Sequence, residues 1–159
     1  MRRIATAICL LLFLAGCDKP TPQVSNDIDL LTKAITLPAR PAEACFVWQT
    51  KGDDVFGPSD HVIMALMRFD AASRSIIEQA AGPYPRDTEI VSLQASVIEP
   101  CRSLLSAMPV LPRCAGDPAK ICIDKEERFS TAFYRGSFTD GRAFRLADGD
   151  WFIVFLFTT

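Results

Sequence analysis

The chain has 159 residues, with 17 basic against 19 acidic side chains and a formal net charge of −2. This mildly acidic balance argues against a nucleic-acid-binding protein, which needs a basic face. The length suits one domain with a sizeable core. Beyond residue 16, no apolar run is long enough to span a bilayer.

The N-terminus has the pattern of a secretory signal peptide, because Arg2 and Arg3 precede a short apolar run over residues 4–15. The run closes on Leu14-Ala15-Gly16-Cys17, which resembles the lipobox of bacterial lipoproteins. In that family the cysteine thiol is diacylated, the peptide is cut just before it, and the new N-terminus is acylated, for example with palmitate. The resemblance implies that residues 1–16 are a signal peptide and that Cys17 anchors the mature chain to a membrane.

Residues 17–27 are predicted to be the lipidated cysteine and a flexible tether, because the segment is polar and contains Pro20 and Pro22. The resemblance places the chain on the periplasmic side of the envelope. In enteric lipoproteins, an aspartate in the position of Asp18 favours retention at the inner membrane. Other bacterial groups follow other rules, so the outer membrane stays open.

Besides the lipidated Cys17, the mature chain has four cysteines: Cys45, Cys101, Cys114 and Cys122. An even set in an exported domain predicts two disulfide bonds. Three pairings are possible, and we favour Cys114–Cys122 across a short loop, with Cys45–Cys101 as the second bond. We expect no metal site, because the chain has no CxxC motif and a single histidine.

Residues 28–159 are predicted to form a single globular domain. Apolar spacing predicts a short helix over 28–37 and a helix that begins after Asp70. Residues 45–50 and 61–69 are predicted strands. The second of these is apolar on both faces, which is typical of a strand in the middle of a covered sheet.

The C-terminal half is predicted to contain a strand over 88–93, short helices over 94–99 and 101–108, and a proline-rich loop over 109–118. A helix is expected over 124–135, because its first residues have capping-box spacing. Two strands, over 142–147 and 151–158, flank turn residues and predict a hairpin. These elements favour an α+β fold, with a mostly antiparallel sheet of about four or five strands packed with three or four helices.

No catalytic constellation stands out in the sequence. His61 follows Ser59 and Asp60, but no GxSxG elbow accompanies them, and a histidine opening a strand is the simpler interpretation. A partner-facing or pH-sensitive role for His61 is the functional alternative. There is no phosphate-binding glycine loop, so we expect neither an enzyme nor a cofactor.

Exposed aromatic and arginine side chains are typical anchors of protein interfaces. On that basis the candidate partner-binding residues are Tyr134, Arg135, Arg142 and Arg145. The leading hypothesis is a non-enzymatic, lipid-anchored protein-binding domain whose general plan resembles that of periplasmic immunity proteins, which neutralise a secreted toxin. The alternatives are an accessory subunit of an envelope or secretion assembly and a small periplasmic hydrolase. The sequence leaves the oligomeric state open.

Overall fold

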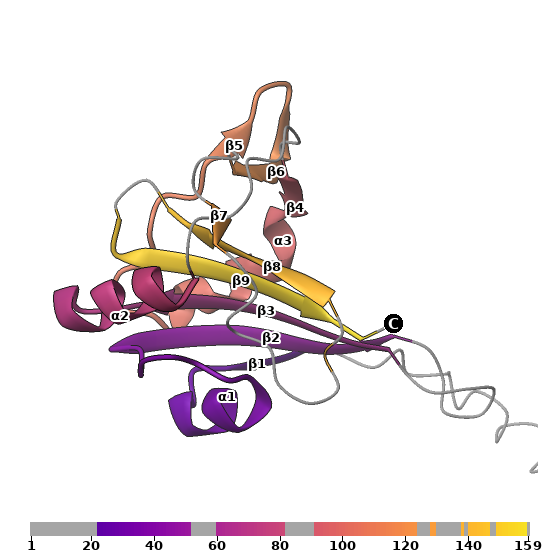
Figure 1. Ribbon diagram of the computed structural model, residues 1–159. Helices are drawn as coiled ribbons and strands as arrows, with labels where there is room; N and C mark the ends of the chain where they lie inside the picture. Colours follow the sequence, from indigo (N-terminus) through magenta and orange to yellow (C-terminus); the bar gives the residue numbers. More distant parts are fainter. Residues whose placement is uncertain are drawn as a thin grey trace, which may run out of the picture.

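The main sheet has six strands in the order β1-β2-β3-β9-β8-β7, and every neighbouring pair is antiparallel (Figure 1). A computed structural model describes residues 22–51, 60–81, 91–123, 128–129, 138, 140–146 and 149–158. The strands of this sheet are β1 (Gln23–Ser25), β2 (Glu43–Lys51), β3 (Asp60–Arg68), β7 (Arg128–Phe129), β8 (Asp140–Arg145) and β9 (Trp151–Phe157).

A second, three-stranded sheet has the order β4-β6-β5 and is also antiparallel. Its strands are β4 (Val91–Gln94), β5 (Arg113–Cys114) and β6 (Asp117–Ile123). The helices are α1 (Ile28–Ala34), α2 (Ala71–Ala81), α3 (Ala95–Ile98) and the 3₁₀ helix η1 (Glu99–Ser103). The predicted α+β class is confirmed, and the second sheet is an addition to the single sheet that the sequence predicts.

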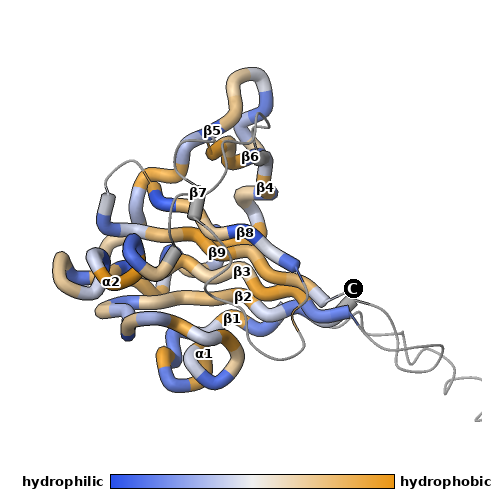
Figure 2. Tube along the Cα trace, viewed as in Figure 1, coloured by the Kyte–Doolittle hydropathy of each residue, from blue (hydrophilic) through white to orange (hydrophobic). Residues whose placement is uncertain are grey.

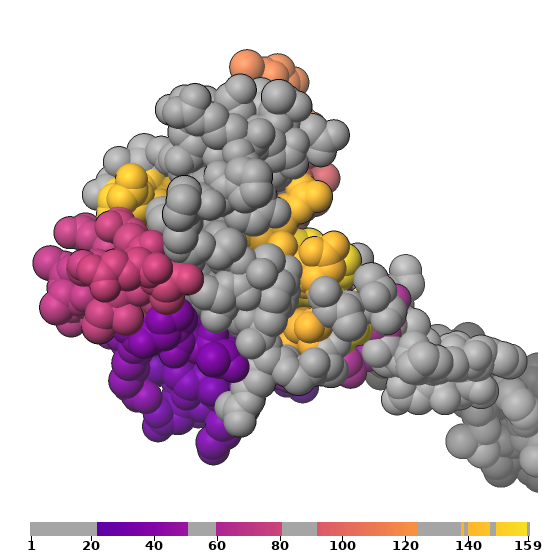
Figure 3. All heavy atoms as spheres, viewed as in Figure 1, coloured from indigo at the N-terminus to yellow at the C-terminus, as the bar shows by residue number. Residues whose placement is uncertain are grey.

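The two faces of the main sheet bury two separate apolar clusters, because successive side chains of a strand point to opposite sides. One cluster includes Phe46 and Phe152 and packs against Leu31 of α1 and Ile77 of α2. The other includes Leu66 and packs against residues of α3, η1 and the small sheet. The domain therefore has three layers, with the main sheet in the middle. Figure 3 shows α2, in magenta, at the surface beside the indigo N-terminal elements.

Strands β3 and β9 are the centre of the sheet and are buried on both faces. Figure 2 shows that both strands are largely hydrophobic. For β3, the apolar character of both faces predicts this position, and the prediction is confirmed. The hairpin of β8 and β9 is also confirmed. Asp70 caps α2 as expected, with the Ser73 amide donating to its Oδ1 at 2.7 Å. That hydrogen bond holds the pKa of Asp70 below its usual range.

Both favoured disulfide bonds are present. Cys45–Cys101 joins β2 to η1 with its Cα atoms 5.6 Å apart, and Cys114–Cys122 joins β5 to β6 at 4.8 Å. The first bond lies inside the apolar cluster between the two sheets, since both of its residues are fully buried. It therefore fixes the layer formed by α3, η1 and the small sheet onto the main sheet.

At one end of the main sheet, Glu43 fastens the segment that follows η1. The Ser106 backbone amide donates to Glu43 Oε2 at 3.1 Å, and the Ser106 hydroxyl donates to Oε1. Arg68 also donates to Glu43 Oε1. These contacts, with the Ser106 hydroxyl contributing most, hold the pKa of Glu43 below its usual range. Charged and polar contacts therefore close this end of the sheet.

The tether prediction is wrong for residues 23–25, which form β1. Gln23 pairs with Trp48 and Ser25 with Phe46, so the edge of β2 recruits this polar segment into the sheet. Val24 adds a partly buried contact to the core. The earlier part of the predicted tether and the signal peptide lie outside the described residues.

Two further predictions in the C-terminal half are wrong. Within the predicted helix over 124–135, residues 128–129 form β7 and pair with Phe144 and Ala143 of β8. The rest of that helix lies outside the described residues. The predicted loop over 109–118 contains β5 and the start of β6, joined at Gly116, which has a φ of +86°. None of the helices within the described ranges is long and apolar enough to cross a membrane.

Candidate binding groove

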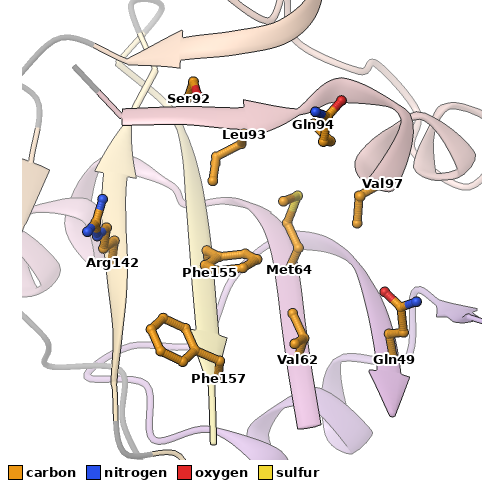
Figure 4. A pocket seen from close by; sticks show the side chains of 10 residues that line it. All are labelled: Gln49, Val62, Met64, Ser92, Leu93, Gln94, Val97, Arg142, Phe155 and Phe157. Atoms are coloured by element: carbon orange, nitrogen blue, oxygen red, sulfur yellow. The ribbon is translucent and has the colours of Figure 1, made fainter. Parts of the chain in front are cut away.

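An open groove of about 420 Å³ lies between the main sheet and the β4–α3 segment (Figure 4). Its volume is in the range of small-molecule pockets. The lining residues are Gln49, Val62, Met64, Ser92, Leu93, Gln94, Val97, Arg142, Phe155 and Phe157. Six of these ten are apolar, so the groove is a largely hydrophobic surface with a few polar groups.

The floor of the groove is built by strand register. Residues paired across neighbouring strands lie side by side on one face of a sheet. Two such rows cross the sheet from β8 or β9 towards β2: Arg142–Phe155–Met64 and Phe157–Val62–Gln49. Phe155 and Phe157, towards the end of β9, are only half-buried.

The wall of the groove is β4, which runs across the strands of the main sheet (Figure 4). Leu93 points from β4 to the floor and is buried, whereas Ser92 and Gln94 are exposed at the rim. β4 pairs with β6 on one side. Among the described residues, no strand pairs with its other side, which faces the groove in Figure 4.

Arg142 supplies a positive charge at the end of the groove where β4 begins (Figure 4). Its side chain is exposed, and within the described ranges it forms no ion pair. None of the lining residues is acidic. The nearest acidic residue along the strand is Asp140, whose Oδ1 accepts a hydrogen bond from the Gly141 amide at 2.6 Å. The groove thus combines an apolar surface with one available cation.

The structure separates the candidate partner-binding residues. Arg142 lines the groove, but Arg145, three residues further along β8, points to the opposite face. There its guanidinium donates to Glu78 Oε1 of α2 at 2.7 Å. Tyr134 and Arg135 lie outside the described residues. Of the predicted arginines, only Arg142 is therefore placed at this groove by the described part of the structure.

His61 also lies on the face opposite the groove. Its ring packs edge-on against Trp48 with 5.9 Å between centroids, and Thr50 Oγ1 lies 3.4 Å from its Nδ1. These contacts fit the interpretation of His61 as a residue near the start of a strand. Ser59 lies outside the described residues. Within the described ranges, no group of three His, Cys, Asp or Glu residues could hold a metal ion.

Sequence reasoning missed the groove itself, including Gln49 and Gln94. No local pattern marks these residues, since the groove is made by four strands of the main sheet and a segment from the second sheet. Comparison of the chain with known protein families, curated proteins and solved structures found no match.

Proposed function

We propose that this chain is a lipid-anchored lipoprotein that faces the periplasm and acts as a non-enzymatic protein-binding domain. The groove with Arg142 at one end is the observation that carries the proposal. Apolar surface supplies binding free energy on burial, and an arginine at its edge is a frequent interface anchor. An immunity protein that binds a secreted toxin is the specific form of this function that we favour.

Three further features support this assignment. The Leu14-Ala15-Gly16-Cys17 sequence resembles a lipobox and is the basis for the proposed lipid anchor. The two disulfide bonds suit an oxidising compartment such as the periplasm. The net charge of −2 suits a protein partner better than a nucleic acid.

A photo-crosslinking residue placed at Ser92 tests protein binding directly in cells. Ser92 is exposed on the groove rim, so we expect it to trap a discrete protein partner. Arg142→Glu is expected to lower the crosslink yield by about tenfold, because loss of a charge-assisted contact costs about 1.5–3 kcal/mol. Gel mobility shifts and mass spectrometry of the products measure the outcome.

The matched control carries the same crosslinker at Ala72, which is exposed on α2 on the other side of the sheet. We expect no Arg142-dependent product from that position. A single soluble toxin among the products supports the immunity form, whereas subunits of a membrane complex favour an accessory role. Absence of any product from Ser92 contradicts protein binding through the groove.

Cys17→Ser is expected to abolish incorporation of radiolabelled palmitate and to release the protein from lipid attachment. The reason is that serine has no thiol to accept the diacylglyceryl group. Labelling of cells, followed by precipitation of the protein, measures the result. Cys9→Ser is the control, since this cysteine lies within the predicted signal peptide and should leave labelling unchanged. Equal label in wild type and Cys17→Ser contradicts the anchor.

A further inference from the structure

We propose that the groove binds the C-terminal residues of a partner protein as an added strand on β4, with the terminal carboxylate on Arg142. This inference rests on the proposed protein-binding function and specifies its ligand. It combines three observations: the span of the groove, the side of β4 that pairs with no described strand, and the position of Arg142 relative to the direction of β4.

The span of the groove suits a short extended peptide. From Arg142 on β8 to Gln49 on β2, the floor crosses four neighbouring strands. Neighbouring strands lie about 4.8 Å apart, so the span is about 14 Å. An extended chain rises about 3.4 Å per residue, which makes this the length of about four residues.

The side of β4 that pairs with no described strand gives such a peptide its main-chain partners. A chain that lies in an apolar groove must find hydrogen-bond partners for its own amide groups. That side of β4 runs along the groove and can supply them by strand addition. Alternate side chains of the added strand would then face the floor at Phe155 and Met64.

The direction of β4 accounts for the position of Arg142. β4 begins beside Arg142 and ends at Gln94, on the side of the groove where Gln49 lies (Figure 4). A strand added antiparallel to β4 therefore ends beside Arg142. Its terminal carboxylate meets a guanidinium, which binds carboxylates through two parallel hydrogen bonds.

The same geometry favours a peptide over a fatty acid of similar shape. A fatty acid also offers a carboxylate and an apolar body, but it has no amide groups for β4. The polar side chains of Ser92 and Gln94 at the rim would likewise find no hydrogen-bond partner in its hydrocarbon chain. Main-chain pairing along β4 is thus the feature that distinguishes the two ligands.

The test uses the mature lipidated protein in nanodiscs and fluorescein-labelled hexapeptides that end in Val, Leu, Ile or Phe. Fluorescence anisotropy measures their Kd. We expect the free-acid peptides to bind at least about tenfold more tightly than their C-terminal amides, since the charge-assisted contact is lost in the amide. Replacing one β4-facing amide of the peptide by an ester is expected to weaken binding about fivefold.

Three variants complete the experiment. Arg142→Gln is expected to weaken the free-acid peptides to the level of the amides and to leave the amides unchanged. Asp140→Asn is expected to tighten free-acid binding, because it removes the nearby negative charge. Arg40→Gln is the control, since Arg40 pairs with Asp29 of α1 on the other side of the sheet.

The outcomes separate this inference from the proposed function. If no peptide binds while Ser92 still crosslinks a protein partner, the C-terminal mode is overturned and protein binding stands. If laurate binds in an Arg142-dependent manner and no peptide does, the groove is a fatty-acid site and the inference is again overturned. Equal Kd values for the free-acid and amide peptides contradict the proposed contact between Arg142 and the terminal carboxylate.

Discussion

Replacing Cys45 and Cys101 together with alanine is expected to lower the free energy of unfolding by about 4 kcal/mol. The bond spans a sequence separation of 56 residues, so its loss frees a long loop in the unfolded chain. Both residues are fully buried between the main sheet and η1. Urea unfolding under non-reducing conditions, followed by the fluorescence of Trp48 and Trp151, measures the change.

The second disulfide provides the matched control. Cys114 and Cys122 are separated by only 8 residues within the β5–β6 hairpin. Their joint replacement by alanine is expected to cost about 2.5 kcal/mol, since the entropy of loop closure grows with the logarithm of loop length. A greater loss from the hairpin bond than from Cys45–Cys101 would contradict the loop-length argument.

The parts of the fold that sequence predicts are those whose local pattern is set by burial. β3 and β9 are apolar on both faces, and only a central strand covered on both sides can bury such a sequence. The α2 start is predicted for a similar local reason, because Asp70 is a good N-cap. In each case the physical cause lies within the segment itself.

The parts that sequence does not predict depend on a neighbouring strand. β1, β5 and β7 have three, two and two residues, too few for a periodic pattern. Gln23–Ser25 becomes a strand because β2 presents an open edge, whatever the polar composition of the segment. Strand propensity is weak compared with such tertiary context.

The candidate site was predictable only as far as single residues. Arg142 and Arg145 look equivalent in sequence, but alternation along β8 sends Arg142 to the groove and Arg145 to Glu78. The groove floor depends on the register of four strands, which no local pattern specifies. The sequence therefore predicts which residue types are suited to an interface, but it does not predict which of them lie together at the groove.

Gly141→Val is expected to lower the free energy of unfolding by about 3 kcal/mol and to weaken the binding of free-acid peptides. Gly141 lies directly before Arg142 and opposite Leu156. A Cβ atom added there would come within 2.5 Å of the Phe155 carbonyl oxygen and would also overlap Leu156. Relief requires movement of β8 or β9, and overpacking of this kind costs about 1–3 kcal/mol or more. Urea unfolding and peptide anisotropy measure the two effects.

Gly116→Ala separates this steric effect from the loss of a glycine as such. A Cβ atom at Gly116 meets nothing within 4 Å, but its φ of +86° is unfavourable for alanine, so a cost of about 1 kcal/mol is expected. Peptide binding should stay unchanged, because Gly116 lies in the β5–β6 turn, away from the groove-lining residues. Equal stability losses in the two variants would contradict the steric argument. An unchanged Kd for free-acid peptides in Gly141→Val would contradict the claim that the position of β8 beside Phe155 controls the contact between Arg142 and the ligand.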